Sequence, residues 1–326
     1  MILVTGGAGF IGSAMIWKLN SNGYNDILVA DELGTADKWL NIVEHNITEI
    51  VHKDELFDFL DKFQREIKAV FHMGACSSTT EVDADFLMKN NFRYSIDLFN
   101  FCTRFEIPFV YASSAATYGS EEDNFNDNHE NITKLKPINK YGYSKQLFDC
   151  WVLKQKQHPP FWAGLKFFNV YGPGESHKGS QASVVFHAFP QIKESGELKL
   201  FKSHRPDVKD FEQKRDFVYV KDVVDVMFHM LTHADTCESG IYNLGSGTAR
   251  TFEALGKAVF NAMDCGKATF KAIDMPDSIR NQYQYFTEAS LSNLREKIGY
   301  TKPMTSLEDG ISDYVQNYLL KGIRAL

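Results

Sequence analysis

Two side chains that can exchange protons lie four residues apart in the segment YGYSK, namely Tyr141 and Lys145. On a helix, residues at this spacing share one face. A lysine ammonium near a tyrosine hydroxyl stabilises the phenolate and lowers the tyrosine pKa from its ordinary value of about 10. The pair therefore predicts an acid/base catalyst that works near neutral pH.

A second lysine, Lys178, lies in the segment GPGESHKGSQASVVFH (172–187), between two histidines and among three serines. A simple dehydrogenase needs only one tyrosine–lysine pair, so another proton-handling group implies a second role. A lysine acts as a base only after burial or neighbouring cations have lowered its pKa. Taken alone, these residues favour a phosphate anchor over an acid/base group at Lys178.

The segment TGGAGFIG (5–12) is rich in glycine and contains the pattern Gly7-x-Gly9-x-x-Gly12. It follows a short apolar run and precedes apolar residues at helical spacing, and Asp31 stands nineteen residues after Gly12. This context is typical of dinucleotide binding, in which glycines let the backbone approach a pyrophosphate at the positive end of a helix. The segment predicts a cofactor site, and Lys145 could then reach the nicotinamide ribose.

The residues leave open which cofactor binds. Asp31 and Glu32 favour NAD, because carboxylates accept hydrogen bonds from the ribose hydroxyls and repel a 2′-phosphate. Lys38 and Lys53 follow shortly downstream and could neutralise that phosphate.

Strands and helices alternate in the first third of the chain, which predicts a parallel sheet with helices on both faces. Ser113 and Ser114 end one of these strands, at the carboxyl edge where such sheets bind ligands, so Ser114 could hydrogen-bond a reacting oxygen. Apolar runs predict strands at 2–5, 26–31, 69–73, 108–114, 217–220 and 241–244, and helical spacing predicts helices at 85–105 and 252–260.

Composition narrows the class of protein. The chain has 326 residues, enough for two domains or one with an elaborate lobe, and a net charge of −7, which disfavours nucleic acid as a partner. No apolar run is long enough to cross a membrane, and Met1 leads directly into a strand-like run without a signal peptide. Five scattered cysteines without a CxxC motif predict no disulfide framework and no metal site, and favour a reducing cytoplasm.

Several motifs occur together in a characteristic order: TGGAGFIGS, SSAATYG (113–119), YGYSK, FFNVYGPGE (167–175), RDFVYVKDV (215–223) and YNLGSG (242–247). With them, the sequence resembles an extended short-chain dehydrogenase/reductase of the sugar-nucleotide type. GACSSTTEVD (74–83) and HKGSQASVVFH (177–187) are more specific. They are similar to the ADP-L-glycero-D-manno-heptose 6-epimerases, which supply the activated heptose of the lipopolysaccharide inner core.

The resemblance implies an α/β fold, a Rossmann-type doubly wound parallel sheet with a smaller α/β substrate-binding lobe. The Rossmann domain would comprise residues 1–168 plus about 214–245, and the lobe 169–213 plus about 246–326. The family oxidises carbon 6″ of its ADP-heptose substrate and returns the hydride to the opposite face. It generally prefers NADP, which decides the expected cofactor despite Asp31, with NAD as the alternative. Family members form homo-oligomers, pentamers in the best-known case, and none of these features implies a nucleic-acid or membrane partner.

The family pattern assigns proton exchange on the two faces of the ketone to Tyr141 and Lys178, with Ser114 positioning the oxygen and Lys145 tuning Tyr141. The implied cofactor-binding residues, besides Lys145, are Gly6, Gly9, Phe10, Ile11, Gly12, Asp31, Glu32, Lys38, Lys53, Gly74, Ala75, Cys76, Ser77, Asn90 and Val170. The implied substrate-binding residues are Ser114, Asn169, Lys178, Ser180, His187, Phe201, Lys202, Ser203, His204, Arg215 and Tyr283. Asn169 and Val170 are expected at the end of the fifth strand.

Other members of the superfamily are the nearest alternatives. A 4-epimerase would not need Lys178, and an epimerase/reductase would consume its cofactor. A 4,6-dehydratase is disfavoured, because Ala115, Ala116 and Thr117 stand where an acidic pair is usual. A non-catalytic nucleotide-binding module would typically lack the tyrosine or the lysine. The sequence departs from the family pattern in a longer 202–214 segment and in Gln282, where an arginine is expected.

Overall fold

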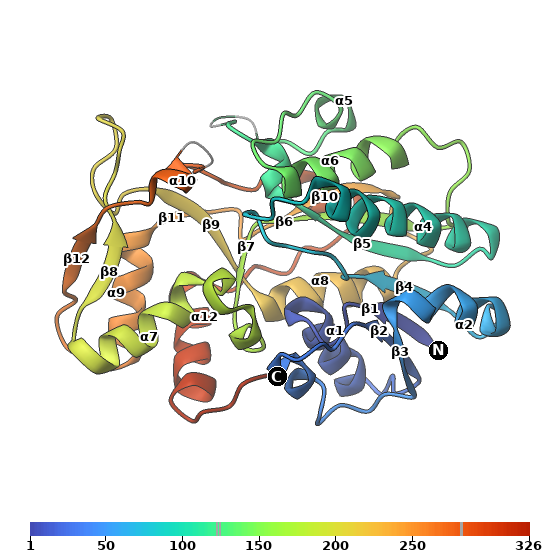
Figure 1. The fold of residues 1–326 in the computed structure, drawn as a ribbon, viewed down its shortest axis with the longest axis horizontal. Coiled ribbons are helices and arrows are strands. Elements are labelled where there is room, and N and C mark those ends of the chain that lie inside the picture. Colours follow the sequence, from blue (N-terminus) through green and yellow to red (C-terminus); the bar gives the residue numbers. More distant parts are fainter. Residues whose placement is uncertain (122, 124, 281–282) are drawn as a thin grey trace.

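A seven-stranded parallel sheet forms the centre of the molecule (Figure 1). The computed structural model describes residues 1–121, 123, 125–280 and 283–326. The sheet has the order β10-β6-β5-β4-β1-β2-β3, so the strand order reverses between β1 and β4, the point where such sheets bind ligands. The predicted Rossmann-type class is confirmed. The strands are β1 (Ile2–Thr5), β2 (Ile27–Asp31), β3 (Glu49–His52), β4 (Ala69–His72), β5 (Phe109–Ser114), β6 (Trp162–Phe167) and β10 (Gly240–Leu244).

Both faces of the sheet are covered by helices. Leu3, Leu28 and Val70 point to one face and pack with residues of α2 (Leu56–Phe63), α4 (Tyr94–Arg104) and α6 (Lys140–Val152). Their strand neighbours, such as Val4 and Val29, point to the other face and pack with α1 (Phe10–Ser21) and α8 (Val220–Thr232). Side chains alternate along a strand, so burial on both faces explains the continuous apolar runs of the sequence.

The helix predicted at 85–105 consists of three pieces. It begins as α3 (Ala84–Leu87), where the Asp83 side chain accepts a hydrogen bond from the Phe86 N–H at 2.9 Å. It widens into a π-helical turn, η3 (Met88–Arg93), before continuing as α4. The prediction of one regular helix is wrong at this turn. Such π-helical turns often occur at functional sites, and this one carries Asn90 and Asn91.

The remaining strands form two small sheets beside the large one. Strands β7 (Asn169–Tyr171), β9 (Lys214–Tyr219) and β11 (Ala249–Thr251) form one, and β8 (Leu198–Phe201) and β12 (Phe270–Ile273) form the other. The prediction that Asn169 and Val170 end a strand of the large sheet is therefore wrong. The chain leaves that sheet after Phe167, and Asn169 begins β7, which pairs with β9.

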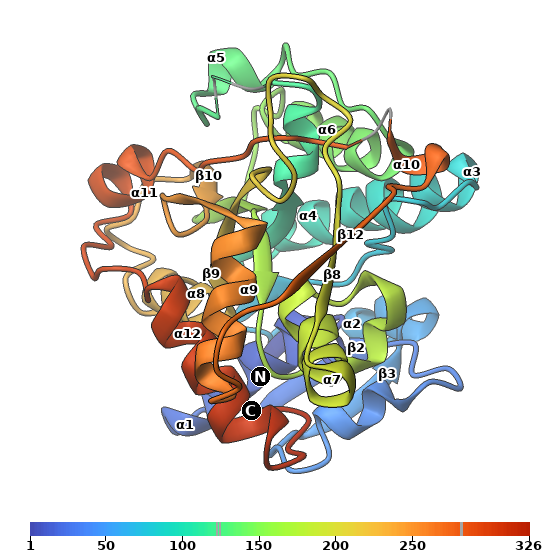
Figure 2. The ribbon, with the colours of Figure 1, turned by 90° about the vertical axis from the view of Figure 1, so that its left-hand side faces the viewer.

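Helices α7 (Val184–Ser195), α9 (Phe252–Ala262) and α12 (Leu307–Tyr314) accompany the small sheets, as Figure 2 shows from the side. None of the helices in the described part of the chain is long and apolar enough to cross a membrane. The shorter elements are η1 (Asp37–Asn41), η2 (Lys53–Glu55), η4 (Ala115–Tyr118), α5 (His129–Ile132), η5 (Ser176–Gln181), α10 (Asp277–Arg280), α11 (Ser292–Lys297) and η6 (Val315–Leu319).

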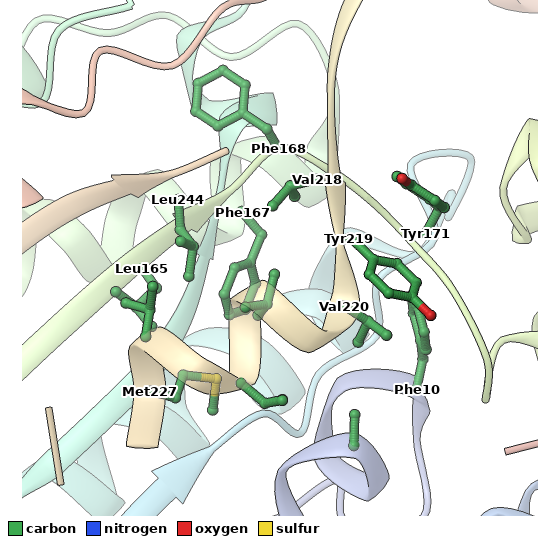
Figure 3. Packing of buried hydrophobic residues seen from close by; sticks show 14 of the residues in the cluster. Phe10, Leu165, Phe167, Phe168, Tyr171, Val218, Tyr219, Val220, Met227 and Leu244 are labelled. Carbon is green, nitrogen blue, oxygen red and sulfur yellow. The ribbon is translucent and has the colours of Figure 1, made fainter. Parts of the chain in front are cut away.

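One hydrophobic cluster joins the large sheet to the small ones (Figure 3). Phe10, at the start of α1, belongs to it, as do Tyr171 of β7 and Tyr219 of β9. Val220, which begins α8, is fully buried in the same cluster. Phe10 of the glycine-rich segment therefore shares one hydrophobic cluster with β7, the strand that leads into the segment carrying Lys178.

Candidate active site

The glycine-rich segment forms a tight turn between β1 and α1. Gly6 has a positive φ of 64°, and its carbonyl accepts a hydrogen bond from the Gly9 N–H at 2.9 Å. A Cβ atom on Gly12 would overlap the Gly6 carbonyl oxygen, and one on Gly6 would lie 2.6 Å from Cα of Gly74. Only glycine fits there, so the backbone is bare where a pyrophosphate would meet the N-terminus of α1. This cradle fits a dinucleotide cofactor, and Gly6, Gly9, Phe10, Ile11 and Gly12 all lie in it.

The carboxylates that follow β2 each face a lysine. Asp31 accepts a hydrogen bond from the Ala8 N–H at 2.8 Å and forms an ion pair with Lys38, whose Nζ lies 2.6 Å away. Lys53 Nζ lies 2.6 Å from Glu32 Oε2, and this contact and its charge lower the pKa of Glu32. The structure thus brings the four residues implied for the adenosine ribose together as two neutralised pairs.

The segment after β4 lies beside the glycine-rich turn. Its Gly74 N–H donates to Thr5 Oγ1 at 3.1 Å. Two residues on, the Cys76 backbone is held from both sides by Asn91, whose Oδ1 accepts from the Cys76 N–H and whose Nδ2 donates to the Cys76 carbonyl, each at 2.9 Å. Gly74, Ala75, Cys76 and Ser77 therefore have a defined place at the reversal point of the sheet.

Sequence reasoning named Asn90 and missed Asn91. The structure shows that Asn91 is fully buried and also donates to Ser144 Oγ of α6 at 3.1 Å, which links the cofactor side of the site to the catalytic helix. Asn90 instead accepts a hydrogen bond from Lys53 Nζ at 3.2 Å. The π-helical turn separates the two roles, and no periodicity in the sequence signals it.

Helix α6 carries the predicted tyrosine–lysine pair. Its N-cap, Asn139, accepts a hydrogen bond from the Gly142 N–H at 2.7 Å. Tyr141 and Lys145 follow one turn apart, both buried, and the Ser114 side chain at the end of β5 hydrogen-bonds Tyr141. The structure therefore brings Ser114, Tyr141 and Lys145 together as predicted.

Burial dominates the electrostatics of this pair. Burial raises the pKa of Tyr141, and the hydrogen bond of Ser114 only partly offsets that effect. Lys145 Nζ donates to the Ala112 carbonyl of β5 at 2.9 Å, and burial lowers its pKa to about 8. The loss of hydration therefore sets the direction of the Tyr141 pKa shift, and the predicted tuning of Tyr141 by Lys145 stays a prediction.

An ion pair that the sequence did not reveal lies behind the catalytic helix. Asp149 of α6 and Lys166 of β6 are both fully buried, with Lys166 Nζ 2.7 Å from Asp149 Oδ2. The same oxygen accepts a hydrogen bond from Ser113 Oγ at 2.7 Å, and Lys166 also donates to Thr117 Oγ1 at 2.7 Å. These contacts tie α6 to the strand end that carries Ser114.

The predicted second proton-handling group, Lys178, lies in the short helix η5. Its Nζ stands 5.5 Å from the centroid of the Phe10 ring, so it faces the cofactor turn rather than bulk water. Burial lowers the pKa of Lys178, while the charge of Glu175 acts in the opposite direction. A half-buried amine with a lowered pKa is suited to proton exchange.

Lys178 lines a cavity of about 480 Å³ between the large sheet and the small ones. Of the residues implied for cofactor or substrate, Asn169, Val170, Arg215 and Tyr283 line the same cavity. Ala116, two residues after Ser114, also lines it, so the end of β5 reaches this space. The cavity therefore unites one proton-handling group with the expected sugar-nucleotide residues.

Arg215 provides a buried cation in the wall of the cavity. Its guanidinium lies 4.8 Å from the Tyr283 ring centroid, and its one hydrogen bond in the described part of the chain goes to the Lys214 carbonyl at 2.9 Å. Among the ion pairs of the described residues, none includes Arg215, although it is only 6% exposed. A buried guanidinium without a carboxylate is suited to hold an anionic group of a ligand.

The next residue of β9, Asp216, points the other way and fixes the strand. It is fully buried and accepts hydrogen bonds from the N–H groups of Ser246, Gly247 and Ala289, the last at 2.9 Å. In the RDFVYVKDV and YNLGSG motifs, Asp216 thus has a structural role, since it holds the Ser246–Gly247 turn. Because side chains alternate along a strand, fixing Asp216 on one face turns Arg215 toward the cavity.

Seven of the implied substrate residues are not among the described residues that line this cavity, and one of them is Ser114 at the end of β5. Ser180 is exposed in η5, and His187 is half-buried on α7. Phe201, Lys202, Ser203 and His204 end β8 and begin the following loop, where the His204 N–H donates to the Tyr285 hydroxyl at 2.9 Å. The Tyr285 ring in turn contacts the ring of Tyr283, with 5.4 Å between the centroids. The side chain of Tyr285 therefore lies between the 201–204 segment and Tyr283 of the cavity wall. Gln282 lies outside the described residues.

The glycine cradle, the YxxxK helix and the cavity with Lys178 and Arg215 occur in a fold that known proteins share. The model of the NAD dependent epimerase/dehydratase family matches residues 2–245. The chain belongs to this family. Its Rossmann-type sheet and its glycine-rich turn are therefore those of an NAD dependent epimerase/dehydratase, and a nicotinamide cofactor fits the cradle described above.

Within the NAD dependent epimerase/dehydratase family, several relatives agree with the specific motifs. The chain is 55% identical to an ADP-L-glycero-D-manno-heptose-6-epimerase of Fusobacterium nucleatum and 49% identical to one of Nitratidesulfovibrio vulgaris, with 98% of each chain covered in both cases. The structure resembles the crystal structure of the Helicobacter pylori ADP-L-glycero-D-manno-heptose-6-epimerase with a TM-score of 0.79 and 28% identity, over 97% of this chain and 95% of that one.

Proposed function

We propose that this chain interconverts ADP-D-glycero-D-manno-heptose and ADP-L-glycero-D-manno-heptose by transient oxidation at carbon 6″, and so makes the heptose precursor of the lipopolysaccharide inner core. The similarity to the ADP-heptose epimerases over nearly the whole chain supports this substrate. The observation that carries the proposal is the place of Lys178, which lines the cavity and faces the cofactor turn at Phe10. A second protic group is needed only if the hydroxyl must be handled on both faces.

The residues would divide the work as follows. The glycine-rich turn would hold a nicotinamide cofactor, which would supply reversible hydride transfer at the alcohol carbon. Tyr141, hydrogen-bonded by Ser114, takes or gives the hydroxyl proton on one face, and Lys178 does so on the other. Lys145 supplies a buried cation one turn from Tyr141, and Ser114 orients the oxygen.

For the cofactor, we propose NADP, with NAD as the alternative. The Asp31–Lys38 and Glu32–Lys53 ion pairs neutralise both carboxylates at the ribose end. A lysine that turns from its carboxylate to a 2′-phosphate would compensate that charge. Mass spectrometry of the cofactor released from the purified protein distinguishes the two.

The cavity wall supports a diphosphate ligand. Arg215 would hold it by a forked contact that a single lysine amine cannot make. Asn169 and Tyr283 line the same cavity and would contact the sugar nucleotide. The segment 201–204 with Ser180 and His187 would complete the site only after the chain closes on the ligand.

The assay offers ADP-D-glycero-D-manno-heptose to the purified protein with its bound cofactor and no added reductant. We expect the L-glycero epimer to accumulate to equilibrium by NMR, without solvent deuterium at carbon 6″. Tyr141→Phe and Lys178→Met should each lower the rate by about 10²- to 10⁴-fold, the usual contribution of a general acid/base, while Lys199→Met on the exposed edge of β8 should not. Full activity of Lys178→Met would instead favour a 4-epimerase-like mechanism, and stoichiometric consumption of reduced cofactor would favour an epimerase/reductase.

A second test concerns the diphosphate site. Arg215→Lys should raise KM about tenfold or more, because one of two forked hydrogen bonds to a charged group, worth roughly 1.5–3 kcal/mol, is lost. Its matched control is Arg250→Lys, since Arg250 pairs with Arg215 across the β9–β11 ladder but forms an ion pair with Glu308. Equal KM values for the wild type and Arg215→Lys would contradict the proposed role.

The remaining parts of the proposal concern the whole protein. A homo-oligomer, a pentamer by family resemblance, is to be checked by light scattering. Free thiols at all five cysteines are compatible with a cytoplasmic enzyme. The proposed division is a Rossmann domain (1–168 plus about 214–245) and a lobe (169–213 plus about 246–326). The membership of β6 and β10 in the large sheet and of β8 and β12 in a small one supports it, whereas β9 pairs with β7 and β11 of the lobe. A non-catalytic module is disfavoured, because Ser114, Tyr141, Lys145 and Lys178 are all present.

A further inference from the structure

Glu175 is a fully buried carboxylate that the proposed reaction does not use. Its Oε2 accepts a hydrogen bond from the Ser183 N–H at 2.5 Å, and its Oε1 accepts one from Ser183 Oγ at 2.7 Å. Oε1 also accepts from the Gly172 N–H at 3.3 Å, and Tyr314 of α12 hydrogen-bonds the same carboxylate. A buried carboxylate with this many donors has a defined position and orientation.

The segment that carries Lys178 is wrapped around this carboxylate. Gly172 precedes the segment and Ser183 follows it, so Glu175 holds both ends. Inside it, the Lys178 N–H donates to the Glu175 carbonyl at 2.9 Å. Ser183 is also the N-cap of α7, where its side chain accepts from the Phe186 N–H at 3.2 Å. The place of Lys178 is thereby fixed relative to both β7 and α7.

The charges around Lys178 are few. Burial lowers its pKa, and Glu175 is the one carboxylate that counteracts this effect in the described part of the chain. His177, beside it, has a pKa lowered by burial and by the Lys178 charge, and so adds no second cation near neutral pH. Burial raises the pKa of Tyr314, which therefore stays a neutral donor to Glu175.

Burial and polar partners act in opposite directions on Glu175, and the net effect raises its pKa. Burial raises its pKa, but the hydrogen bonds from Ser183, the charge of Lys178 and the hydrogen bond from Gly172 all act against that rise. The buried carboxylate and the half-buried amine therefore form a linked pair within one short segment.

We propose that Glu175 is a positioning residue for Lys178: its buried carboxylate fixes the segment 172–183 and supplies the negative charge that faces the Lys178 amine. The proposal rests on the proposed function only for the role of Lys178 in turnover, because the pairing of the two groups is a property of the folded chain.

The test measures the Lys178 titration directly. Lysine labelled with ¹³C at the ε-carbon is introduced, and the Lys178 signal is assigned by its loss in Lys178→Met. In Glu175→Gln we expect the Lys178 pKa to fall by about one pH unit, the lower end of the effect of a nearby opposite charge. The limb of the pH–rate profile that depends on Lys178 should move by the same amount in the same direction.

A matched control is the buried carboxylate Asp222 of α8. It accepts from the N–H and the hydroxyl of Thr305 at 2.7 and 2.8 Å, the same pattern that Glu175 makes with Ser183. Asp222→Asn should lower stability to a similar degree and leave the Lys178 titration unchanged. If Glu175→Gln does not fold, Glu175→Asp is used instead. This variant keeps the negative charge but shortens the side chain by one methylene. It should lower the Lys178 pKa by less than the change expected for Glu175→Gln.

The outcomes separate this inference from the proposed function. A Lys178 pKa within about 0.2 units of the wild type in Glu175→Gln, or in Glu175→Asp where only that variant folds, would overturn the inference. Absence of epimerisation by the wild type would instead contradict the proposed function, while the NMR titration would still decide whether the pair exists.

Discussion

Lys145 shows how burial sets the chemistry of a single residue. Its amine is held by one backbone carbonyl, that of Ala112, and burial lowers its pKa to about 8. The folded protein thus keeps a cation where a cation is costly. Such a group is expected at a site that needs the charge for function rather than for stability.

We predict that Lys145→Met makes the protein more stable but inactive. The pKa of the lysine is about 8 in the folded state and about 10.4 when unfolded, so at pH 7 the folded state bears the cost of the charge. At pH values between the folded-state and the unfolded-state pKa of Lys145, the unfolded protein binds more protons than the folded protein. The free energy of unfolding of the wild type therefore rises with pH over this range. The variant should therefore exceed the wild type by roughly 1–3 kcal/mol at pH 7 and by little above pH 10.

Denaturant unfolding of the two proteins from pH 7 to 10.5 gives this difference directly. Lys199→Met, which removes an exposed lysine of β8, serves as the control and should stay level with the wild type throughout. A stability difference between Lys145→Met and the wild type that does not change with pH would show that the buried charge is not its cause.

At the scale of elements, the ion pair between Asp149 and Lys166 joins α6 to the strands β5 and β6. Asp149 lies one turn after Lys145, and it also accepts a hydrogen bond from Ser113, the neighbour of Ser114. The catalytic helix and the catalytic serine are therefore held by a common buried carboxylate. Removing one charge leaves the other buried without a partner, which is more costly than removing both.

We predict that Asp149→Asn and Lys166→Met each lower the free energy of unfolding by about 3–5 kcal/mol, the usual effect of breaking a buried pair. The double variant should recover a large part of this loss. Chemical denaturation of the three variants measures the coupling energy as a double-mutant cycle. The comparison pair is Lys297 and Glu238, which lie 3.0 Å apart but are well exposed.

Glu238→Gln should cost less than about 1 kcal/mol, as expected of an exposed pair. If the losses from Asp149→Asn and Lys166→Met were simply additive in the double variant, the two residues would not act as a pair.

At the scale of the whole molecule, the end of the chain returns to the cofactor side. The Arg324 carbonyl accepts a hydrogen bond from the Gly174 N–H at 2.7 Å, and the Arg324 guanidinium lies 3.1 Å from Asp37. Asn41 of η1, buried nearby, donates to the carbonyls of Ala8 and Gly174 at 3.0 Å each. The segment before Lys178 is thus tied to the glycine-rich turn and to the last residues of the chain.

We predict that removing residues 321–326 slows turnover several-fold with a smaller effect on thermal stability. The deletion frees the Gly174 N–H, a backbone hydrogen bond worth roughly 1 kcal/mol, next to the segment that positions Lys178. Steady-state rates and thermal unfolding measure the two effects. Arg324→Ala keeps the carbonyl and removes only an exposed ion pair, so it should resemble the wild type. A deletion variant with unchanged rates would show that the tail does not position this segment.

The sequence by itself determined the class of fold and the chemistry of the main groups. Apolar runs alternating with helical patterns predicted the parallel sheet, because burial on both faces of a strand removes polar alternation. The glycine spacing and the YxxxK pair were recognisable because their chemistry requires those residue types at short spacing, whereas the acid/base role of Lys178 was implied only by the family resemblance. These features are local, and local spacing is readable from one chain.

Only the tertiary structure decided which distant residues share an environment. The pairing of Asp149 with Lys166, the hold of Asn91 on Cys76 and the burial of Glu175 join segments through packing that no periodicity encodes. The direction of the Tyr141 pKa shift followed the same rule, since it depends on how much water the fold removes from the hydroxyl. Residue types are properties of the chain, whereas hydration and the distances between charges exist only once the chain is packed.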